Sequence, residues 1–193
     1  MKRLIAAVVF AFLVISPSLV YSGTILWGYE QWKSDASGQV LEWQRYNMNF
    51  VPNTPKADGN QTATARILNE DKWGKVYYVT GKSSADIIKT YHYLYLNTYD
   101  VQGNMKVAVS GEDGSDYYEV TSYVISGNTG NPKVIYNPGP YVFDLSGWAP
   151  KTPQNNVVVQ LIAEGGSQKG FEVNRVFISD YNPITQGKAP KKR

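Results

Sequence analysis

Apolar and polar residues alternate with a period of two along most of this 193-residue chain, and helical periodicity is almost absent. Successive side chains of a β-strand point to opposite faces, so the alternation predicts strands that bury one face. Gly, Asn, Asp and Pro stand between the alternating stretches, where turns need them. The pattern predicts an all-β fold of about nine short strands, arranged as a two-sheet β-sandwich or jelly roll.

Two of the expected strands contain a change of phase, one near Gln44 and Arg45 and the other near Asn174, which is typical of a β-bulge. The Asp-Gly pair in the segment 111–116 predicts a hairpin between its flanking strands. One short helix is expected at 83–89. The predicted strands are 40–50, 63–69, 75–80, 89–99, 105–110, 117–125, 141–145, 156–163 and 171–179.

The N-terminus has the features of a secretory signal peptide. Lys2 and Arg3 precede an apolar run that is too short to span a bilayer as a helix, and Pro17 ends this run. The protein is therefore expected to be secreted or periplasmic, with no integral membrane segment in the mature chain. The expected division is a signal peptide at 1–22, a β-sandwich domain at 23–182 and a disordered basic tail at 183–193.

The expected domain has to be stable without disulfides, because the chain contains no Cys. A chain of this size buries about two-thirds of its unfolded surface, which is enough for a stable core. Export without disulfides is compatible with a bacterial origin. Loss of the signal peptide leaves a net charge close to zero, so no nucleic-acid partner is expected.

Tyr91, Tyr93 and Tyr95 form a row at every second position, and His92 and two leucines lie between them or directly after them. In a regular strand the three phenol rings would share the outer face, and His92 would lie with the leucines on the core face. Aromatic rings pack on the C–H faces of sugars. This tyrosine row therefore predicts a platform for a flat ligand, although tyrosines in strands also serve simply as packing residues.

Other candidates for ligand binding lie on different segments. Arg45, Asn47 and Asn49 alternate on the predicted strand 40–50 and supply polar groups that could hydrogen-bond sugar hydroxyls. Trp73 lies in a predicted loop that is rich in charge, where an exposed Trp is costly unless it binds something. A Trp that caps one end of the sandwich is the alternative.

An enzyme is the less favoured interpretation. His92 is the single histidine, which excludes a His-rich metal site. Paired carboxylates could hydrolyse glycosides if they lay a few ångströms apart. The candidate carboxylates are Glu42, Glu119, Glu164 and Glu172. Nucleotide-binding, zinc-protease and serine-hydrolase motifs are absent from the sequence.

The C-terminal part of the chain resembles a known family. The stretch 141–148 reads Tyr-Val-Phe-Asp-Leu-Ser-Gly-Trp, and it precedes apolar strands at 157–162 and 170–178. This order resembles the closing strands of the galactose-binding-like jelly roll found in many carbohydrate-binding modules. Tyr29 and Glu30 near Trp32 resemble the opening of that family. The resemblance implies a domain that binds polysaccharide without catalysing a reaction.

The same resemblance implies a structural Ca²⁺, held between an N-terminal Glu and an Asp on the last strand. Glu30 matches the first position. Asn174 stands where the family has Asp, and Asp180 follows further along. An Asn carbonyl can also ligate Ca²⁺. No cofactor is otherwise required.

The sequence thus predicts a secreted, non-enzymatic β-sandwich whose partner is a polysaccharide or another glycan. Two alternatives stay open. One is a structural or adhesion component of a cell-envelope assembly, with an envelope protein as its partner. The other is a jelly-roll polysaccharide lyase or glycoside hydrolase.

Overall fold

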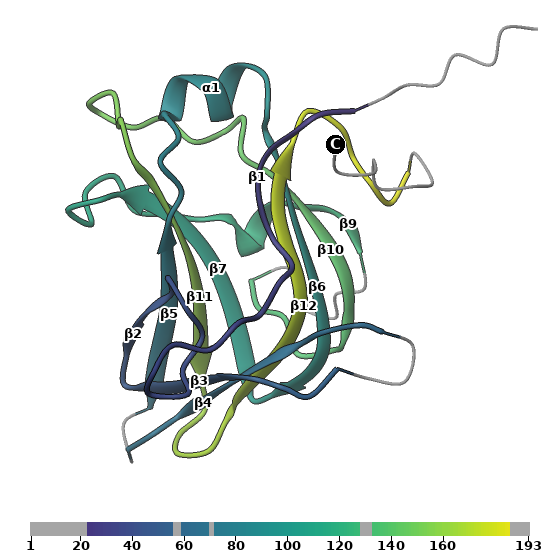
Figure 1. Ribbon diagram of the computed structural model, residues 1–193. Coiled ribbons are helices and arrows are strands. Elements are labelled where there is room, and N and C mark those ends of the chain that lie inside the picture. Colours follow the sequence, from purple (N-terminus) through teal and green to yellow (C-terminus); the bar gives the residue numbers. More distant parts are fainter. Residues whose placement is uncertain (1–22, 56–58, 70–71, 128–132, 186–193) are drawn as a thin grey trace, which may run out of the picture.

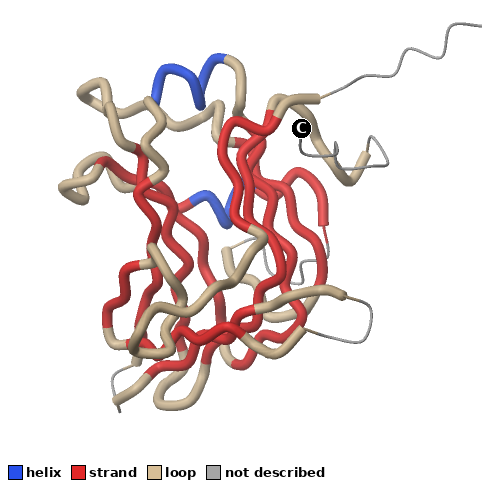
Figure 2. The backbone as a smooth tube through the Cα atoms, viewed as in Figure 1, coloured by secondary structure: helices blue, strands red, loops and turns tan. Residues whose placement is uncertain are grey.

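The computed structural model describes residues 23–55, 59–69, 72–127 and 133–185, so the expected signal peptide and residues 186–193 of the expected tail lie outside it. Within these residues two antiparallel sheets face each other (Figure 1), and loops of different lengths join the strands (Figure 2). The predicted all-β, two-sheet sandwich is confirmed.

The larger sheet has the strand order β3-β4-β12-β6-β10-β9, with β1 also paired to β12, and the smaller sheet has the order β2-β5-β11-β7-β8. The strands of the larger sheet are β1 (Ile25–Tyr29), β3 (Met48–Pro52), β4 (Ala63–Ile67), β6 (Tyr93–Gln102), β9 (Val124–Gly127), β10 (Gly139–Asp144) and β12 (Gly170–Ser179). Those of the smaller sheet are β2 (Gln44–Tyr46), β5 (Trp73–Val79), β7 (Asn104–Gly111), β8 (Tyr118–Glu119) and β11 (Val157–Glu164).

The core lies between the sheets and is built from alternate residues of the strands. Val157, Val159 and Leu161 of β11 are fully buried, and they belong to the same core cluster as Val176 and Ile178 of β12. Branched side chains favour strands because they pack well on a pleated surface. The period of two in the sequence therefore corresponds to an inner and an outer face in both sheets.

The predicted strand 40–50 is divided between the two sheets. Asn47 has a φ of 52° and separates β2, in the smaller sheet, from β3, in the larger sheet. Asn tolerates this left-handed conformation because its short amide bonds to nearby backbone. Asn47 Nδ2 donates to the Trp73 carbonyl at 3.0 Å. The change of phase in the sequence is therefore a crossing between sheets at Asn47, and the expected β-bulge near Gln44 and Arg45 is wrong.

The predicted strand 117–125 is also interrupted. β8 pairs with β7 across the expected turn, but a 3₁₀ helix, η1 (Val120–Tyr123), follows before the chain joins the larger sheet as β9. The Thr121 hydroxyl accepts a hydrogen bond from Val107 N at 2.7 Å and donates to Val107 O. A side chain thus satisfies the backbone groups of β7 that a longer β8 would have paired.

The expected irregularity at Asn174 is confirmed. The pairing of β12 with β6 shifts register on either side of Val173, and Asn174 is left out of the pairing. Trp32 Nε1 donates to the Asn174 carbonyl at 2.6 Å, and Asn174 Nδ2 donates to the Gln61 carbonyl at 2.9 Å. The groups freed by the bulge therefore anchor the N-terminal segment and the loop before β4.

The short helix α1 (Ser84–Lys89) agrees with its prediction. It begins after Ser83, whose hydroxyl accepts a hydrogen bond from Asp86 N. Figure 1 shows α1 at one end of the sandwich. Among the described residues, no helix has the length and apolar character needed to cross a bilayer.

Candidate functional site

The tyrosine row does not form one open surface. Tyr91 precedes β6 and packs against the core, so the prediction that all three rings share a strand face is wrong for Tyr91. Tyr93 and Tyr95 lie on the outer face of the larger sheet, where both are half-buried. The Tyr95 ring stacks on Phe177 of β12, with 4.6 Å between the ring centroids. Phe177 is only 1% exposed, so the row is part of a packed layer.

Tyr181 covers this layer where the chain leaves β12. Its ring stacks on Phe177 and is 2% exposed. Gly23 lies so close to the Tyr181 ring that a Cβ would not fit, and Thr24 N donates to Asp180 Oδ1 at 2.7 Å. Figure 1 shows the two ends of the described chain meeting at this place. Burial raises the pKa of Tyr181 to about 12.

His92 was predicted to be a core residue, and this prediction is wrong. It precedes β6 and is half-buried, and its ring centroid lies 4.3 Å from that of Tyr93. The His92 carbonyl accepts a hydrogen bond from Leu145 N at 2.7 Å. The prediction failed because β6 begins one residue after His92, so the alternation of that strand does not extend to it.

The three polar candidates lie far from the tyrosine row. Arg45 is exposed on β2 of the smaller sheet, and Asn47 lies at the crossing between the sheets. Asn49 lies on β3 and accepts a hydrogen bond from Gln39 Nε2. β4 and β12 separate β3 from β6 in the larger sheet. These residues therefore do not form one polar rim around Tyr93.

Two of the three residues implied as Ca²⁺ ligands, Glu30 and Asn174, lie near each other because β1 pairs with β12, but each is engaged by another partner. Glu30 Oε2 is 2.9 Å from Arg175 Nη2, and the Asn174 amide bonds to the Gln61 carbonyl. Asp180 lies six residues beyond Asn174, which is about 20 Å along an extended chain. The described residues contain no group of three or more His, Asp or Glu that could hold a metal ion. The residues present do not fit the implied ion.

Trp73, in contrast, lies on an open surface. It is the first residue of β5, whereas the sequence placed it in a loop, and it is 42% exposed. Tyr46 of the neighbouring strand β2 stacks on the indole, with the centroids 4.9 Å apart and the planes 27° from parallel. Tyr46 is itself 51% exposed. Tyr46 thus covers one face of the indole, and much of the Trp73 side chain remains exposed to solvent.

Alternate residues of the neighbouring strands extend this surface across the smaller sheet. In the register of β5, β11 and β7, Ile162 lies between Lys75 and Lys106, and Glu164 lies opposite Trp73. We call this surface the open face. Its side chains are Tyr46, Trp73, Lys75, Lys106, Tyr117, Glu119, Gln160, Ile162 and Glu164.

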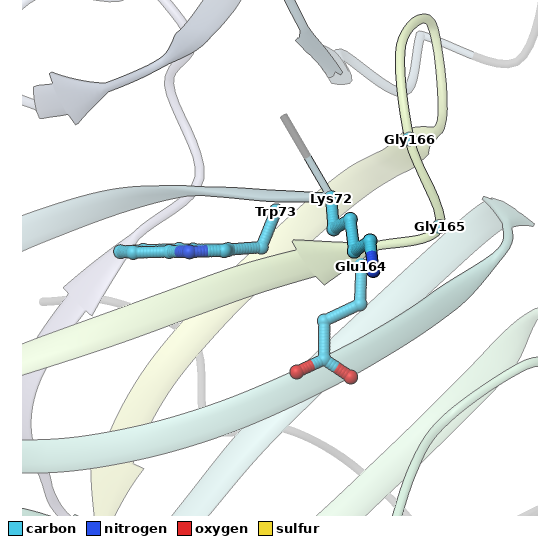
Figure 3. Close-up of a pocket in the computed structure, with 5 residues that line it drawn as sticks. All are labelled: Lys72, Trp73, Glu164, Gly165 and Gly166. Atoms are coloured by element: carbon cyan, nitrogen blue, oxygen red, sulfur yellow. The ribbon is translucent and has the colours of Figure 1, made fainter. Parts of the chain in front are cut away.

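Two adjoining hollows lie on the open face, and both are lined by Trp73 and Glu164. One has a volume of about 530 Å³ and is completed by Lys72, Gly165 and Gly166 (Figure 3). Figure 3 shows the flat indole extending from β5, with Glu164 projecting from the adjacent strand just before the two glycines. The other hollow, of about 360 Å³, extends toward the exposed Tyr117 on the far side of the face. Together they form a shallow surface with an aromatic ring on each side.

A chain of hydrogen bonds leads from the buried Ser110 to Gln160 and Lys75, which line the second hollow. The Ser110 hydroxyl donates to the Gly111 carbonyl and accepts from Gln160 Nε2 at 2.8 Å. Gln160 Oε1 in turn accepts from Lys75 Nζ at 2.9 Å. Ser110 and Gln160 are buried, so the orientation of the Gln160 amide is fixed and it holds the Lys75 ammonium in place.

A second polar group surrounds Lys106. Its Nζ is 3.1 Å from Glu164 Oε1 and 3.6 Å from Glu119 Oε2. The hydrogen bond that Lys106 donates to Glu164 raises the pKa of Lys106, so this lysine is a cation throughout the neutral range. Burial raises the pKa of Tyr117, which therefore keeps its hydroxyl proton as a donor. The open face thus combines exposed rings with donors and acceptors held by their neighbours.

Trp73 was predicted from the sequence as a binding residue, and Glu119 and Glu164 as candidate carboxylates for hydrolysis, but the other residues of the open face were missed. The signal that could have found Lys75 is the alternation in 73–79, which places it on the same side of the strand as Trp73. In the apolar stretch 157–164, Gln160 and Glu164 are the polar residues. They lie four positions apart and so mark one face of the strand.

Comparison with known proteins identified no matching family model and no matching curated sequence. Solved structures with a similar fold include a carbohydrate-binding module with specific mannan recognition, at 10% identity and a TM-score of 0.43, covering 83% of this chain and 99% of that chain. A family 29 carbohydrate-binding module is 14% identical, with 89% and 95% covered and a TM-score of 0.41. An exo-β-agarase is 8% identical, with 82% of this chain but 25% of the agarase covered and a TM-score of 0.44. These structures are similar to this chain in fold, at low sequence identity.

Proposed function

We propose that this chain is a carbohydrate-binding protein without catalytic activity, and that a polysaccharide lies along the open face. The observation that carries the proposal is the exposed Trp73, which Tyr46 supports from one side, beside a hollow lined by polar groups. Apolar rings left in water are unfavourable, and the C–H face of a sugar would cover them.

The polar side chains of the open face suit the hydroxyl rim of a sugar. Each hydroxyl both donates and accepts, so it can bond to the carboxylates of Glu119 and Glu164 and to the Lys75 ammonium. Trp73 and Tyr117 both line the second hollow, and β11 and β7 lie between β5 and β8 in the smaller sheet. A shallow surface of this width suits a chain of sugars better than one small molecule.

The carboxylates of the open face favour binding over hydrolysis. Glu119 and Glu164 both form ion pairs with the Lys106 ammonium. A glycosidase that uses two carboxyl groups needs one of them protonated. His92 precedes β6 in the larger sheet and is not part of this face. Both carboxyl groups gathered here are paired with one lysine, so neither is free to serve as the acid of a glycosidase.

Affinity electrophoresis tests the proposal. Native gels would contain mannan, xylan, agarose, β-glucan, pectin or alginate. We expect at least one polysaccharide to retard the mature chain, and Trp73→Ala to lose this retardation. Tyr93→Ala is the matched control, because it removes an aromatic ring from the other sheet, and it should migrate like the wild type.

Retardation by none of the polymers, or equal retardation of Trp73→Ala, would contradict the proposal. Release of reducing sugars would instead identify an enzyme.

A protein partner is the second candidate, because Tyr123 and Ile125 are exposed where the chain enters β9 at the edge of the larger sheet. An edge strand offers unpaired backbone groups to another chain. An envelope assembly would then be the setting. Sedimentation that shows concentration-dependent association without affinity for any glycan would favour this function over the first.

We also infer that the protein acts outside the cytoplasm, in the periplasm or in the medium, where polysaccharides are met. This inference depends on residues 1–22, which the structure does not describe. Cell fractionation followed by N-terminal sequencing should find a mature chain that begins near Gly23. Recovery of the full-length chain from the cytoplasm alone would contradict export.

A further inference from the structure

We propose that the glycan bound by the open face is acidic, and that Lys75 binds the carboxylate of a uronic acid residue. This inference rests on the proposed function of the face and names the class of its ligand. It starts from the contacts of Lys75. Within the described residues, Lys75 Nζ forms no ion pair; it donates to Gln160 Oε1 at 2.9 Å and lies 5.2 Å from the centre of the Tyr77 ring.

Among the residues that the structure describes, this cation has no counter-charge within ion-pair distance. The side chain of Lys75 is half-buried on the floor of the 360 Å³ hollow, and burial lowers its pKa. The cause is desolvation, which disfavours the charged form of an ammonium when no anion replaces the lost water. A carboxylate from the ligand would supply the missing charge and form a charge-assisted hydrogen bond.

Lys106, on the same face, forms ion pairs and so differs from Lys75. Its ammonium lies between Glu119 and Glu164, so this side of the hollow has two carboxylates for one cation. Excess negative charge there would attract hydroxyl donors of a sugar and repel a carboxylate. The two sides of the hollow therefore orient an acidic sugar, with its carboxylate toward Lys75 and its hydroxyls toward Glu119.

The spacing of Trp73 and Lys75 fits such a sugar. They lie two positions apart on the same side of β5, which is about 7 Å along the strand. The Lys75 ammonium extends further along the sheet, to Gln160 and the Tyr77 ring. When one sugar ring of an acidic oligomer packs on the indole, the carboxylate of a neighbouring uronic acid can therefore lie beside this ammonium. The hydrogen bonds from Ser110 through Gln160 already hold that ammonium, which reduces the entropy lost on binding.

Titration calorimetry with matched ligands tests the inference. The probes are oligogalacturonate, oligomannuronate and oligoglucuronate of equal length, each compared with its carboxyl-reduced, neutral form. We expect the wild type to bind at least one acidic oligomer about tenfold more tightly than its reduced form. Lys75→Gln should lose this preference and still bind the reduced form, and Lys75→Arg should keep it. Lys89→Gln, which makes the same change of charge on α1, is the matched control and should behave like the wild type.

Two further results complete the test. Salt should weaken binding of the acidic oligomer by the wild type more than binding of the reduced one, a measurement that does not depend on the folding of any variant. Equal affinity for both forms, or a preference for the acid that persists in Lys75→Gln, would overturn the inference. If the inference failed in this way but binding was still lost in Trp73→Ala, the proposed function would remain supported. Binding of neither form, together with no retardation by any polysaccharide in the gels, would overturn both.

Discussion

On the outer face of the larger sheet, Tyr95, Phe177 and Tyr181 stack on one another, whereas on the smaller sheet Tyr46 and Trp73 stack with much of their surface in solvent. Both faces carry aromatic residues at alternate positions, so the strands themselves do not distinguish them. The two faces differ in the segments that cover them. The chain turns back over the larger sheet after β12 and places Tyr181 on it.

This difference separates two roles for the same kind of residue. The rings of the closed layer around Phe177 are buried against one another and away from water, so they contribute to the stability of the fold. Trp73 and Tyr46 make one ring contact with each other and leave the remaining area exposed. Their contribution to stability is therefore small, and their exposed area is available to a ligand.

The largest expected effect is on the closed layer. Phe177→Ala removes a buried ring between Tyr95 and Tyr181, so we expect the free energy of unfolding to fall by about 3–5 kcal/mol. Trp73→Ala, which removes an exposed ring, should change it by about 1 kcal/mol or less. Urea unfolding followed by circular dichroism measures both values. Equal losses of stability from Phe177→Ala and Trp73→Ala would contradict the difference between a closed and an open face.

The next effect concerns binding. Trp73→Ala should weaken binding of the retained polysaccharide by about 10- to 100-fold, the equivalent of burying one aromatic face. Tyr46→Ala should weaken it by about three- to tenfold, since it removes only the ring that supports the indole. Calorimetry gives both ratios. A larger loss from Tyr93→Ala than from Trp73→Ala would move the site to the larger sheet.

A smaller effect is expected from Tyr181→Phe. The buried Tyr181 hydroxyl has no hydrogen-bond partner among the described residues, so its removal should stabilise the fold by about 1 kcal/mol at neutral pH. The pKa of Tyr181 is raised from 10.0 to about 12. The folded state therefore keeps this phenol neutral while the unfolded state ionises, and stability is lost as the pH rises from 10 to 12. Tyr181→Phe should lose less stability over that interval in chemical denaturation, and an equal loss would contradict burial of the phenol.

The smallest effect is expected from Lys106→Met, which removes two partly exposed ion pairs and keeps an apolar stem. The free energy of unfolding at pH 7 should fall by at most about 1 kcal/mol. Because Glu164 raises the pKa of Lys106 above 10.5, this difference is complete below pH 10.5 and disappears as the pH rises through the folded-state pKa. Denaturant unfolding of both proteins at several pH values measures it. A difference that grew with pH would contradict the pairing.

Much of the fold could be predicted from local sequence, because the period of two is set by the strand itself. The bulge at Asn174 and the helix after Ser83 were predicted for the same reason, since each depends on residues close together in the chain. The crossing at Asn47 could not be predicted. It depends on which sheet each half of the stretch 40–50 joins, and this is decided by contacts with β5 and β4, distant in sequence.

The candidate site was less predictable than the fold. Alternation places Tyr93 and Tyr95 on an outer face, and the structure agrees, but alternation does not show that Phe177 and Tyr181 close that face. The open face needs the register of strands that lie far apart in the sequence. Lys75 and Lys106 flank Ile162 only because β5 and β7 both pair with β11.

The most direct test of binding at the open face is chemical-shift mapping of the ¹⁵N-labelled mature chain during titration with the polysaccharide that retards it. We predict that the Trp73 indole N–H and the backbone amides of β5, β11 and β7 shift, with Lys75 and Gln160 among them, and that Tyr93, Tyr95 and Phe177 do not. Shifts centred on β6 and β12, with the open face unchanged, would contradict this placement of the site.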